Sequence, residues 1–246
     1  MRNALKLKMH DYIHRPEGKL VFNREMFTVI APRYDFITRA LSLGRDKAWK
    51  NQMIQNLPTL KSPRCLDLAC GTGDITFRLA EKYPGAAIAG LDLTEAMLAS
   101  AKSRNSYENI EFTTQNMCRT NFSDRTFDIV TGGYALRNAP SLEDALAEIS
   151  RVMKPGGTAA FLDFSRPPHP LTQKAEYFLL KTWGGFWGLT LHRNPQVYTY
   201  IAESLKQFPD SNQLRKLIAK VGFEIVWSKK HYFGIAETLI FKKPCP

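Results

Sequence analysis

The sequence has few cysteines, and they form no pattern that would bind a metal. Cys65, Cys70, Cys118 and Cys245 contain no CxxC pair, and none stands at zinc-finger spacing from another cysteine or a histidine. No metal is therefore expected. Cys65 and Cys70 fall in an expected strand and the turn after it, where small buried thiols are common. We therefore expect the cysteines to be reduced, as they are in cytosolic proteins.

Long apolar runs are also missing. No stretch of eighteen apolar residues occurs, so a membrane-spanning helix is not expected. Residues 1–19 contain basic side chains but no apolar segment or small-residue cleavage site, so no secretion signal is expected. Acidic residues are fewer than basic ones, and the net charge is +11. Such a charge suits nucleic acid, an anionic membrane, an acidic substrate or merely a soluble surface, and does not choose among them.

Strand-like and helix-like stretches alternate from Arg64 onward, after a basic and helical section at residues 1–61. Near-continuous apolar strands between helices predict a mostly parallel sheet covered on both faces. Thr94 and Ser141 are expected to cap helices. The strands are expected at 64–70, 86–93, 110–116, 127–134, 157–165, 223–233 and 234–243, and the helices at 47–57, 74–83, 94–105, 141–153 and 211–223.

A glycine-rich turn follows the first expected strand, in the stretch CLDLACGTGDIT. Gly71 and Gly73 would let the backbone approach a ligand closely, but a dinucleotide fingerprint would need a glycine where Thr76 stands. Asp67 would repel a pyrophosphate, whereas a sulfonium cofactor with an amino-acid tail favours acidic company. Asp92, about twenty residues on, suits a ribose. Taken alone, Asp67 could equally accept hydrogen bonds from backbone amides. Taken together, Asp67, the two glycines and Asp92 favour S-adenosylmethionine (SAM) as the ligand.

Several motifs resemble a known family. LDLACGTGD and GLDLTEAML are similar to class I SAM-dependent methyltransferases, and RVMKPGGTAAFLDFS fits a signature of the UbiE family. GGYALRN and YTYIAESLKQFPD resemble that family's active-site segment and a later motif. YDFITRALSLGRDKAW resembles its N-terminal signature, but Ile37, Thr38 and Asp46 replace the usual Met, Asn and His. NMCRTNF and HRNPQVY also depart from the family pattern, with Cys118 in place of an acid.

The resemblance implies a Rossmann-like, seven-stranded methyltransferase domain at 62–246, with residues 1–61 as a substrate cap and an aromatic lid inserted at about 166–209. It implies C-methylation of a prenylated hydroquinone, demethylmenaquinol or a ubiquinone precursor, with SAM as cofactor. The residues that it places around the cofactor are Asp67, Gly71, Thr72, Gly73, Asp92, Leu93, Met97, Asn116, Met117 and Gly133.

Arg137 is the first candidate for catalysis. A guanidinium after the fourth strand could stabilise an oxyanion or orient a water that acts as base; the alternative is a surface ion pair with Glu143 or Asp144. Tyr34 could relay a proton or simply pack against Trp49. Asp92 is expected to help fix the local polar network.

The three downstream histidines are expected to be structural or solvated. They are His169, His192 and His231. His192 is the strongest candidate base among them, because the family's polar substrate loop should lie there.

The inserted stretch YFLLKTWGGFWGLTL contains Trp183, Phe186 and Trp187. It could be the hydrophobic side of a packed helix or a lid over a prenyl tail, and interfacial aromatics with basic residues would suit peripheral contact with an anionic membrane at its cytoplasmic face. A nucleic-acid methyltransferase is disfavoured, because GGYALRN stands where an N/D-P-P-Y-type motif should. Another small aromatic acceptor, a non-catalytic SAM-binding role and a homodimer stay open.

Overall fold

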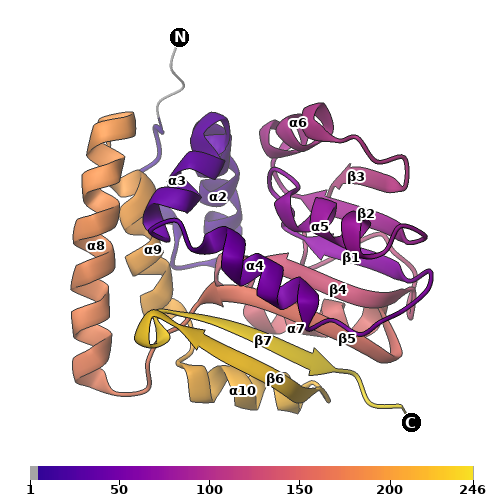
Figure 1. Ribbon diagram of the computed structural model, residues 1–246. Helices are drawn as coiled ribbons and strands as arrows, with labels where there is room; N and C mark the ends of the chain where they lie inside the picture. The colour runs from indigo at the N-terminus through magenta and orange to yellow at the C-terminus, as the bar shows by residue number, and fades with distance from the viewer. Residues whose placement is uncertain (1–4, 246) are drawn as a thin grey trace.

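The computed structural model describes residues 5–245, so Met1 to Ala4 of the expected N-terminal section and Pro246 lie outside the described residues. Its centre is one seven-stranded sheet in the order β3-β2-β1-β4-β5-β7-β6 (Figure 1). β7 runs antiparallel to both neighbours, and the other paired strands are parallel. The strands are β1 Arg64–Leu68, β2 Ala87–Asp92, β3 Ile110–Thr114, β4 Phe127–Gly133, β5 Met153–Phe164, β6 Glu224–His231 and β7 Ala236–Lys242. The predicted mostly parallel α/β sheet is confirmed.

Helices surround this sheet, and each predicted helix is found with ends shifted by a few residues. β5 begins earlier than predicted, because Met153 pairs with Phe127 and a register shift follows before Thr158. The helices are α1 Met9–Tyr12, α2 Pro16–Ile30, α3 Tyr34–Leu41, α4 Asp46–Gln55, α5 Asp74–Lys82, α6 Glu95–Arg104, α7 Leu142–Val152, α8 Pro170–His192, α9 Gln196–Gln207 and α10 Ser211–Lys220.

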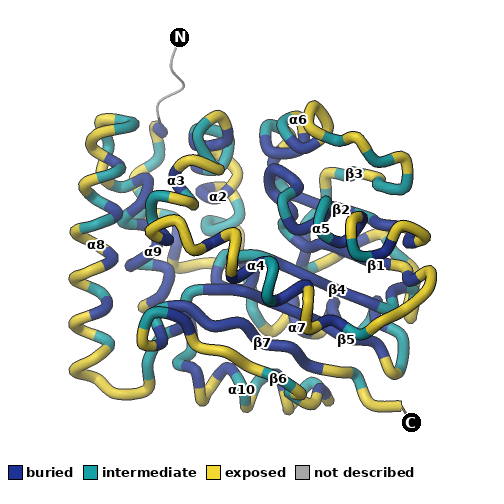
Figure 2. The backbone as a smooth tube through the Cα atoms, in the orientation of Figure 1, coloured by how far each residue is buried: buried dark blue, intermediate teal, exposed yellow. Residues whose placement is uncertain are grey.

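Both faces of the sheet are buried, which explains why its central strands are apolar throughout. Cys65 of β1 faces a core formed with α4 and α5. Its neighbour Leu66 faces the opposite core, which includes α7 and α10. Successive residues of a strand point to opposite faces, so a strand covered on both sides has no polar alternation. Figure 2 shows these central strands largely buried.

The N-terminal helices and the insertion meet beside the carboxyl ends of the central strands (Figure 1). α2 and α3 pack against α9 in a third apolar cluster that includes Phe22, Ile37 and Tyr200. α8 lies along α9, and its Trp187 and Leu191 pack against this cluster. Two segments far apart in sequence therefore build one wall beside the ends of β4 and β5.

Ser141 and Thr94 both occupy the predicted N-cap positions, but only Ser141 makes a side-chain cap. Ser141 Oγ accepts a hydrogen bond from the Asp144 amide at 3.2 Å. Thr94 makes no side-chain cap; its amide instead donates to Asp92 Oδ1 at 2.9 Å. Asp92 thus satisfies the amide of the N-cap residue itself, whereas an N-cap hydroxyl would accept from an amide in the first turn of α6. Within residues 5–245, no helix combines the length and apolarity needed to cross a membrane.

Candidate active site

The turn after β1 depends on glycine. Gly71 and Gly73 have φ of +56° and +86°, a backbone conformation that residues other than glycine rarely adopt. A Cβ on Gly73 would lie 2.7 Å from the Phe77 ring. A Cβ on Gly71 would face the Tyr34 ring at 3.6 Å. The turn therefore brings bare backbone close to the N-terminal section.

Asp92 ties this turn to the end of β2. Its Oδ2 accepts from the Gly71 amide at 2.9 Å, and its Oδ1 accepts from the Thr94 amide at 2.9 Å. Burial raises the pKa of Asp92 above its ordinary value, although the two amides oppose the shift. The carboxylate thus has a fixed position.

A cavity beside the glycine turn, here named the turn cavity, contains most of the predicted cofactor residues. It lies at the carboxyl ends of β1, β2 and β4, where ligands bind in open α/β sheets. The predicted residues that line it are Gly71, Asp92, Leu93, Met97, Asn116, Met117 and Gly133. The Asn116 side-chain oxygen accepts from the Cys118 amide at 3.0 Å, which orients the amide group in the wall.

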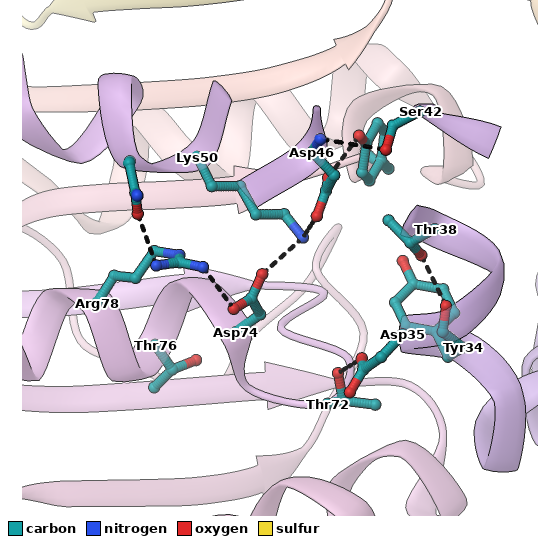
Figure 3. Close-up of polar contacts among 12 residues, drawn as sticks. Tyr34, Asp35, Thr38, Ser42, Asp46, Lys50, Thr72, Asp74, Thr76 and Arg78 are labelled. Atoms are coloured by element: carbon teal, nitrogen blue, oxygen red, sulfur yellow. Dashed lines mark hydrogen bonds and ion pairs between the residues drawn. The ribbon is translucent and has the colours of Figure 1, made fainter. Parts of the chain in front are cut away.

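Asp67, Thr72 and Gly73 do not line the turn cavity. Both oxygens of Asp67 accept from hydroxyls, those of Thr76 at 2.7 Å and Thr131 at 2.9 Å. Burial raises the pKa of Asp67 to about 6. The Thr72 hydroxyl donates to Asp35 at 2.6 Å (Figure 3). These residues hold the turn in shape.

The sequence motifs gave no sign that α2 contributes to this cavity. Asn23 and Phe27 both line it. Asn23 Nδ2 donates to the Asn138 carbonyl at 2.8 Å, whereas Asn23 Oδ1 is buried and accepts no hydrogen bond from the described residues. A buried oxygen without a donor is costly, so this atom suits a polar ligand group. The contribution of α2 to this cavity follows only from how α2 packs beside the carboxyl ends of the strands.

A second cavity, here named the apolar cavity, adjoins the first. Phe27, Tyr34 and Tyr134 line both, so their rings form the shared wall. The other side chains come from α2, α3, α9 and the segments after β4 and β5, and most are apolar. They are Met26, Ile30, Ile37, Thr38, Leu41, Ser42, Arg137, Phe164, Val197, Tyr198, Tyr200 and Ile201.

The insertion lines the apolar cavity with side chains of α9. The aromatic residues that were expected to form a lid lie on α8 instead. Trp183, Phe186 and Trp187 lie on α8, contact one another and line neither cavity. The reason is that α8 turns its glycines toward α9. A Cβ on Gly184 or Gly188 would lie 2.6 or 2.7 Å from backbone oxygens of the facing chain. Close packing on that side leaves the large rings elsewhere on the helix.

Arg137 is buried at the apolar cavity. The alternative prediction for this residue, an ion pair at the protein surface, is therefore wrong. Its Nε lies 3.1 Å from Asp163 Oδ1, and its Nη1 donates to Ser204 Oγ at 3.2 Å. The guanidinium carbon lies 5.3 Å from the Phe164 ring centroid. Burial raises the pKa of Asp163 to about 6, with Arg137 opposing the shift. The charge of Arg137 is held in one orientation by β5 and α9.

Tyr34 stands between the two cavities. Its ring contacts Phe27 with centroids 6.2 Å apart. Trp49, the expected alternative partner, stacks on His231 instead, at 4.9 Å. Burial raises the pKa of Tyr34 to about 12, so the phenol stays protonated near neutral pH and is a donor.

None of the three histidines lines either cavity. His231 is buried and bonded to the Thr238 hydroxyl at 2.9 Å, and burial lowers its pKa to about 4. His169 caps α8 by accepting from the Leu171 amide at 3.3 Å. His192 lies 2.9 Å from the Tyr198 hydroxyl, so it touches the wall of the apolar cavity from outside.

The strand order, the single antiparallel strand β7 and the glycine turn after β1 together define the class I methyltransferase fold. A SAM-dependent methyltransferase from Aquifex aeolicus shares it with a TM-score of 0.60 at 14% identity, over 88% of this chain and 98% of that one. The [4+2]-cyclase SpnF shares it with a TM-score of 0.63 at 16% identity, over 89% of this chain and 96% of that one. The fold alone therefore leaves the reaction open.

Sequence comparison identifies the family. The model of the ubiE/COQ5 methyltransferase family matches residues 17–243, and the chain belongs to this family. It is 33% identical to the ubiquinone/menaquinone biosynthesis C-methyltransferase UbiE of Dinoroseobacter shibae, over 90% of each chain. It is 35% identical to the demethylmenaquinone methyltransferase of Thermus thermophilus, over 89% of this chain and all of that one. The family predicted from the motifs is confirmed.

Proposed function

We propose that this protein transfers a methyl group from SAM to a ring carbon of a prenylated hydroquinone, with demethylmenaquinol as the first acceptor to test. One observation carries the proposal: the turn cavity, which holds the buried Asp92 carboxylate, and the apolar cavity are both lined by the same three aromatic rings. Substrates held in the two cavities would touch where the cavities meet beside these rings, and direct methyl transfer requires such contact.

The residues of the turn cavity fit SAM. Asp92 has a fixed carboxylate that would accept from the ribose hydroxyls, and the Asn116 oxygen would accept from the adenine amino group. The unpartnered Asn23 Oδ1 would accept from an ammonium or hydroxyl. When bound, SAM supplies an electrophilic methyl group on a sulfonium.

The residues of the apolar cavity fit a hydroquinone with an apolar tail. A ring carbon becomes nucleophilic when a neighbouring hydroxyl loses its proton, and the Arg137 guanidinium would stabilise the resulting oxyanion. As the ring carbon bonds the methyl group, the bond from that group to the sulfonium sulfur breaks, and the proton of the ring carbon would then pass to water to restore the aromatic ring. The Tyr200 hydroxyl is buried beside Asn23 and lines the apolar cavity, so it can meet a ring oxygen. Aliphatic side chains of α2, α3 and α9 would enclose the rest of the acceptor.

The test is transfer of label from methyl-labelled SAM by the purified protein into reduced demethylmenaquinol. Labelled menaquinol is expected. An extract of quinone precursors and a panel of simple phenols serve as parallel acceptors. SAM binding with label only in a phenol would replace the hydroquinone by another small aromatic substrate, and the absence of SAM binding would contradict methyl transfer altogether.

We further propose that the outer face of α8 rests on an anionic membrane. Five large apolar side chains there are more than half exposed, and on a helical wheel they fall within an arc of about 100°. They are Leu171, Phe178, Leu179, Phe186 and Leu189. Figure 2 shows much of α8 exposed along its length. Lys174 and Lys181 lie on the same helix, and the net charge of +11 favours anionic lipid.

Replacing both Phe178 and Leu189 with serine is expected to weaken vesicle binding at least about fivefold, because each loses apolar area that would enter the bilayer surface. The measurement is co-sedimentation with vesicles of phosphatidylglycerol and phosphatidylcholine at low salt. Val226→Ser, an exposed apolar residue of β6, is the matched control and should bind like the unchanged protein. Equal binding by all three proteins, or none by the unchanged protein, would contradict this role of α8.

A further inference from the structure

A buried chain of charges joins α4 to the helix that follows the glycine turn. The Lys50 ammonium lies 2.7 Å from Asp46 Oδ2 and 2.9 Å from Asp74 Oδ2 (Figure 3). Asp74 is the first residue of α5, and its other oxygen lies 3.0 Å from Arg78. The Lys50 side chain is only 7% exposed, so each charge depends on its partners.

This chain of charges ends on the aromatic wall between the two cavities. The Tyr134 hydroxyl donates to Asp46 Oδ1 at 2.7 Å. Tyr134 directly follows β4 and has a φ of +57°, which is uncommon for a residue with a large side chain. Its backbone amide is held by the Leu162 carbonyl, and its hydroxyl by Asp46. The Asp46 bond fixes the hydroxyl end of the ring, whose face packs against Phe164 with centroids 5.5 Å apart.

Asp46 is also where the N-terminal signature departs from its usual histidine. A neutral side chain there would leave Lys50 with Asp74 as its remaining carboxylate partner, and Asp74 is already shared with Arg78. In this protein the carboxylate serves two purposes at once. It balances a buried cation, and it accepts from the wall tyrosine.

We propose that Asp46 is a positioning residue for methyl transfer, which holds the Tyr134 ring at the boundary of the two cavities. The inference rests on the proposed function, since the ring would contact both substrates. Asp46 lines neither cavity and therefore acts through Tyr134. Lys50 and Asp74 extend the same support to the start of α5, so one network aligns the cofactor turn with the acceptor wall.

The experiment compares Asp46→Asn, Tyr134→Phe and the double variant. Each single variant is expected to lower kcat/KM for the acceptor about tenfold, because a small displacement of the wall misaligns the reacting atoms. SAM affinity, measured by calorimetry, should change less than about threefold, since most of the turn cavity is untouched. The double variant should be no worse than either single one, because each removes the hydrogen bond from the Tyr134 hydroxyl to a carboxylate.

Glu148→Gln is the matched control. Glu148 is a buried carboxylate whose partner is Arg151, 2.7 Å away, and it lines neither cavity. It should lower the melting temperature without lowering kcat/KM in proportion. Additive losses in the double variant, or a Glu148→Gln loss equal to that of Asp46→Asn, would overturn the proposal.

A spectroscopic readout separates this inference from the proposed function. In protein containing 3-fluorotyrosine, the Tyr134 fluorine resonance is assigned by its absence in Tyr134→Phe. Asp46→Asn is expected to shift or broaden that resonance. An unchanged resonance would show that Asp46 does not hold the ring, whatever the enzyme methylates. If the unchanged protein transfers no methyl group, the proposed function fails and the fluorine spectrum alone decides the role of Asp46.

Discussion

Arg137→Ala is expected to lower kcat for methyl transfer by about 10²- to 10³-fold, the usual loss when a preorganised stabiliser of an oxyanion is removed. The guanidinium is buried at the apolar cavity and held by Asp163 and Ser204, so its charge requires little reorganisation during the reaction. It does not line the turn cavity. SAM affinity should therefore stay within about threefold of the original.

The measurement pairs initial rates with labelled SAM and demethylmenaquinol against calorimetric SAM binding. Arg137→Lys should recover little, because a lysine lacks the planar fork that meets Asp163 and Ser204 together. Arg151→Ala is the matched control: Arg151 is also paired with carboxylates but lines neither cavity, and its kcat should stay near the original. An Arg137→Ala enzyme that keeps more than about a tenth of its turnover would exclude this stabilising role.

Asp92→Asn is expected to weaken SAM binding about 100-fold, equivalent to about 2.7 kcal/mol. Both carboxylate oxygens accept from backbone amides, of Gly71 and of Thr94. An asparagine of the same size must present a donor NH2 to one of these donors, so either the glycine turn or the start of α6 shifts. The loss of the negative charge also removes an acceptor for the ribose.

Calorimetry of SAM binding, with melting temperatures recorded in parallel, tests this prediction. Asp128→Asn is the matched control, because Asp128 also accepts from a backbone amide, that of Arg64, and lines neither cavity. Its SAM affinity should be unchanged. If Asp92→Asn bound SAM as tightly as Asp128→Asn, Asp92 would be a structural residue and the ribose would bind elsewhere.

Much of the fold could be predicted from local pattern. Apolar runs interrupted by Gly, Pro and capping residues located all seven strands and the helices α4, α5, α6, α7 and α10, because a strand buried on both faces has a distinctive composition. The helices α8 and α9 of the insertion were not predicted. Errors occur where a distant group intervenes. β5 starts at Met153, earlier than its apolar run predicts, because Phe127 of β4 pairs with it.

The candidate site was predicted in part. Spacing along the chain placed Gly71 and Asp92 together, since the carboxyl ends of parallel strands meet at one end of the sheet, and the family resemblance added Gly133. The same spacing could not distinguish a residue that lines the cavity from one that supports it. Asp67 proves to be enclosed by two threonine hydroxyls. The partner of Arg137 was also missed, because Asp163 lies 26 residues away on the next strand.

The sequence by itself determined the family, the sheet and the position of the glycine turn, because these depend on short motifs and on periodicity along the chain. Only the tertiary structure decided which side chains meet. It brings α2, α3 and α9 together at the carboxyl ends of β4 and β5 and leaves the large aromatic rings of α8 out of the lining of the apolar cavity. It also joins Asp46 to Tyr134, 88 residues apart in the sequence. Such contacts depend on how separate helices pack, a property of the whole chain that no local pattern encodes.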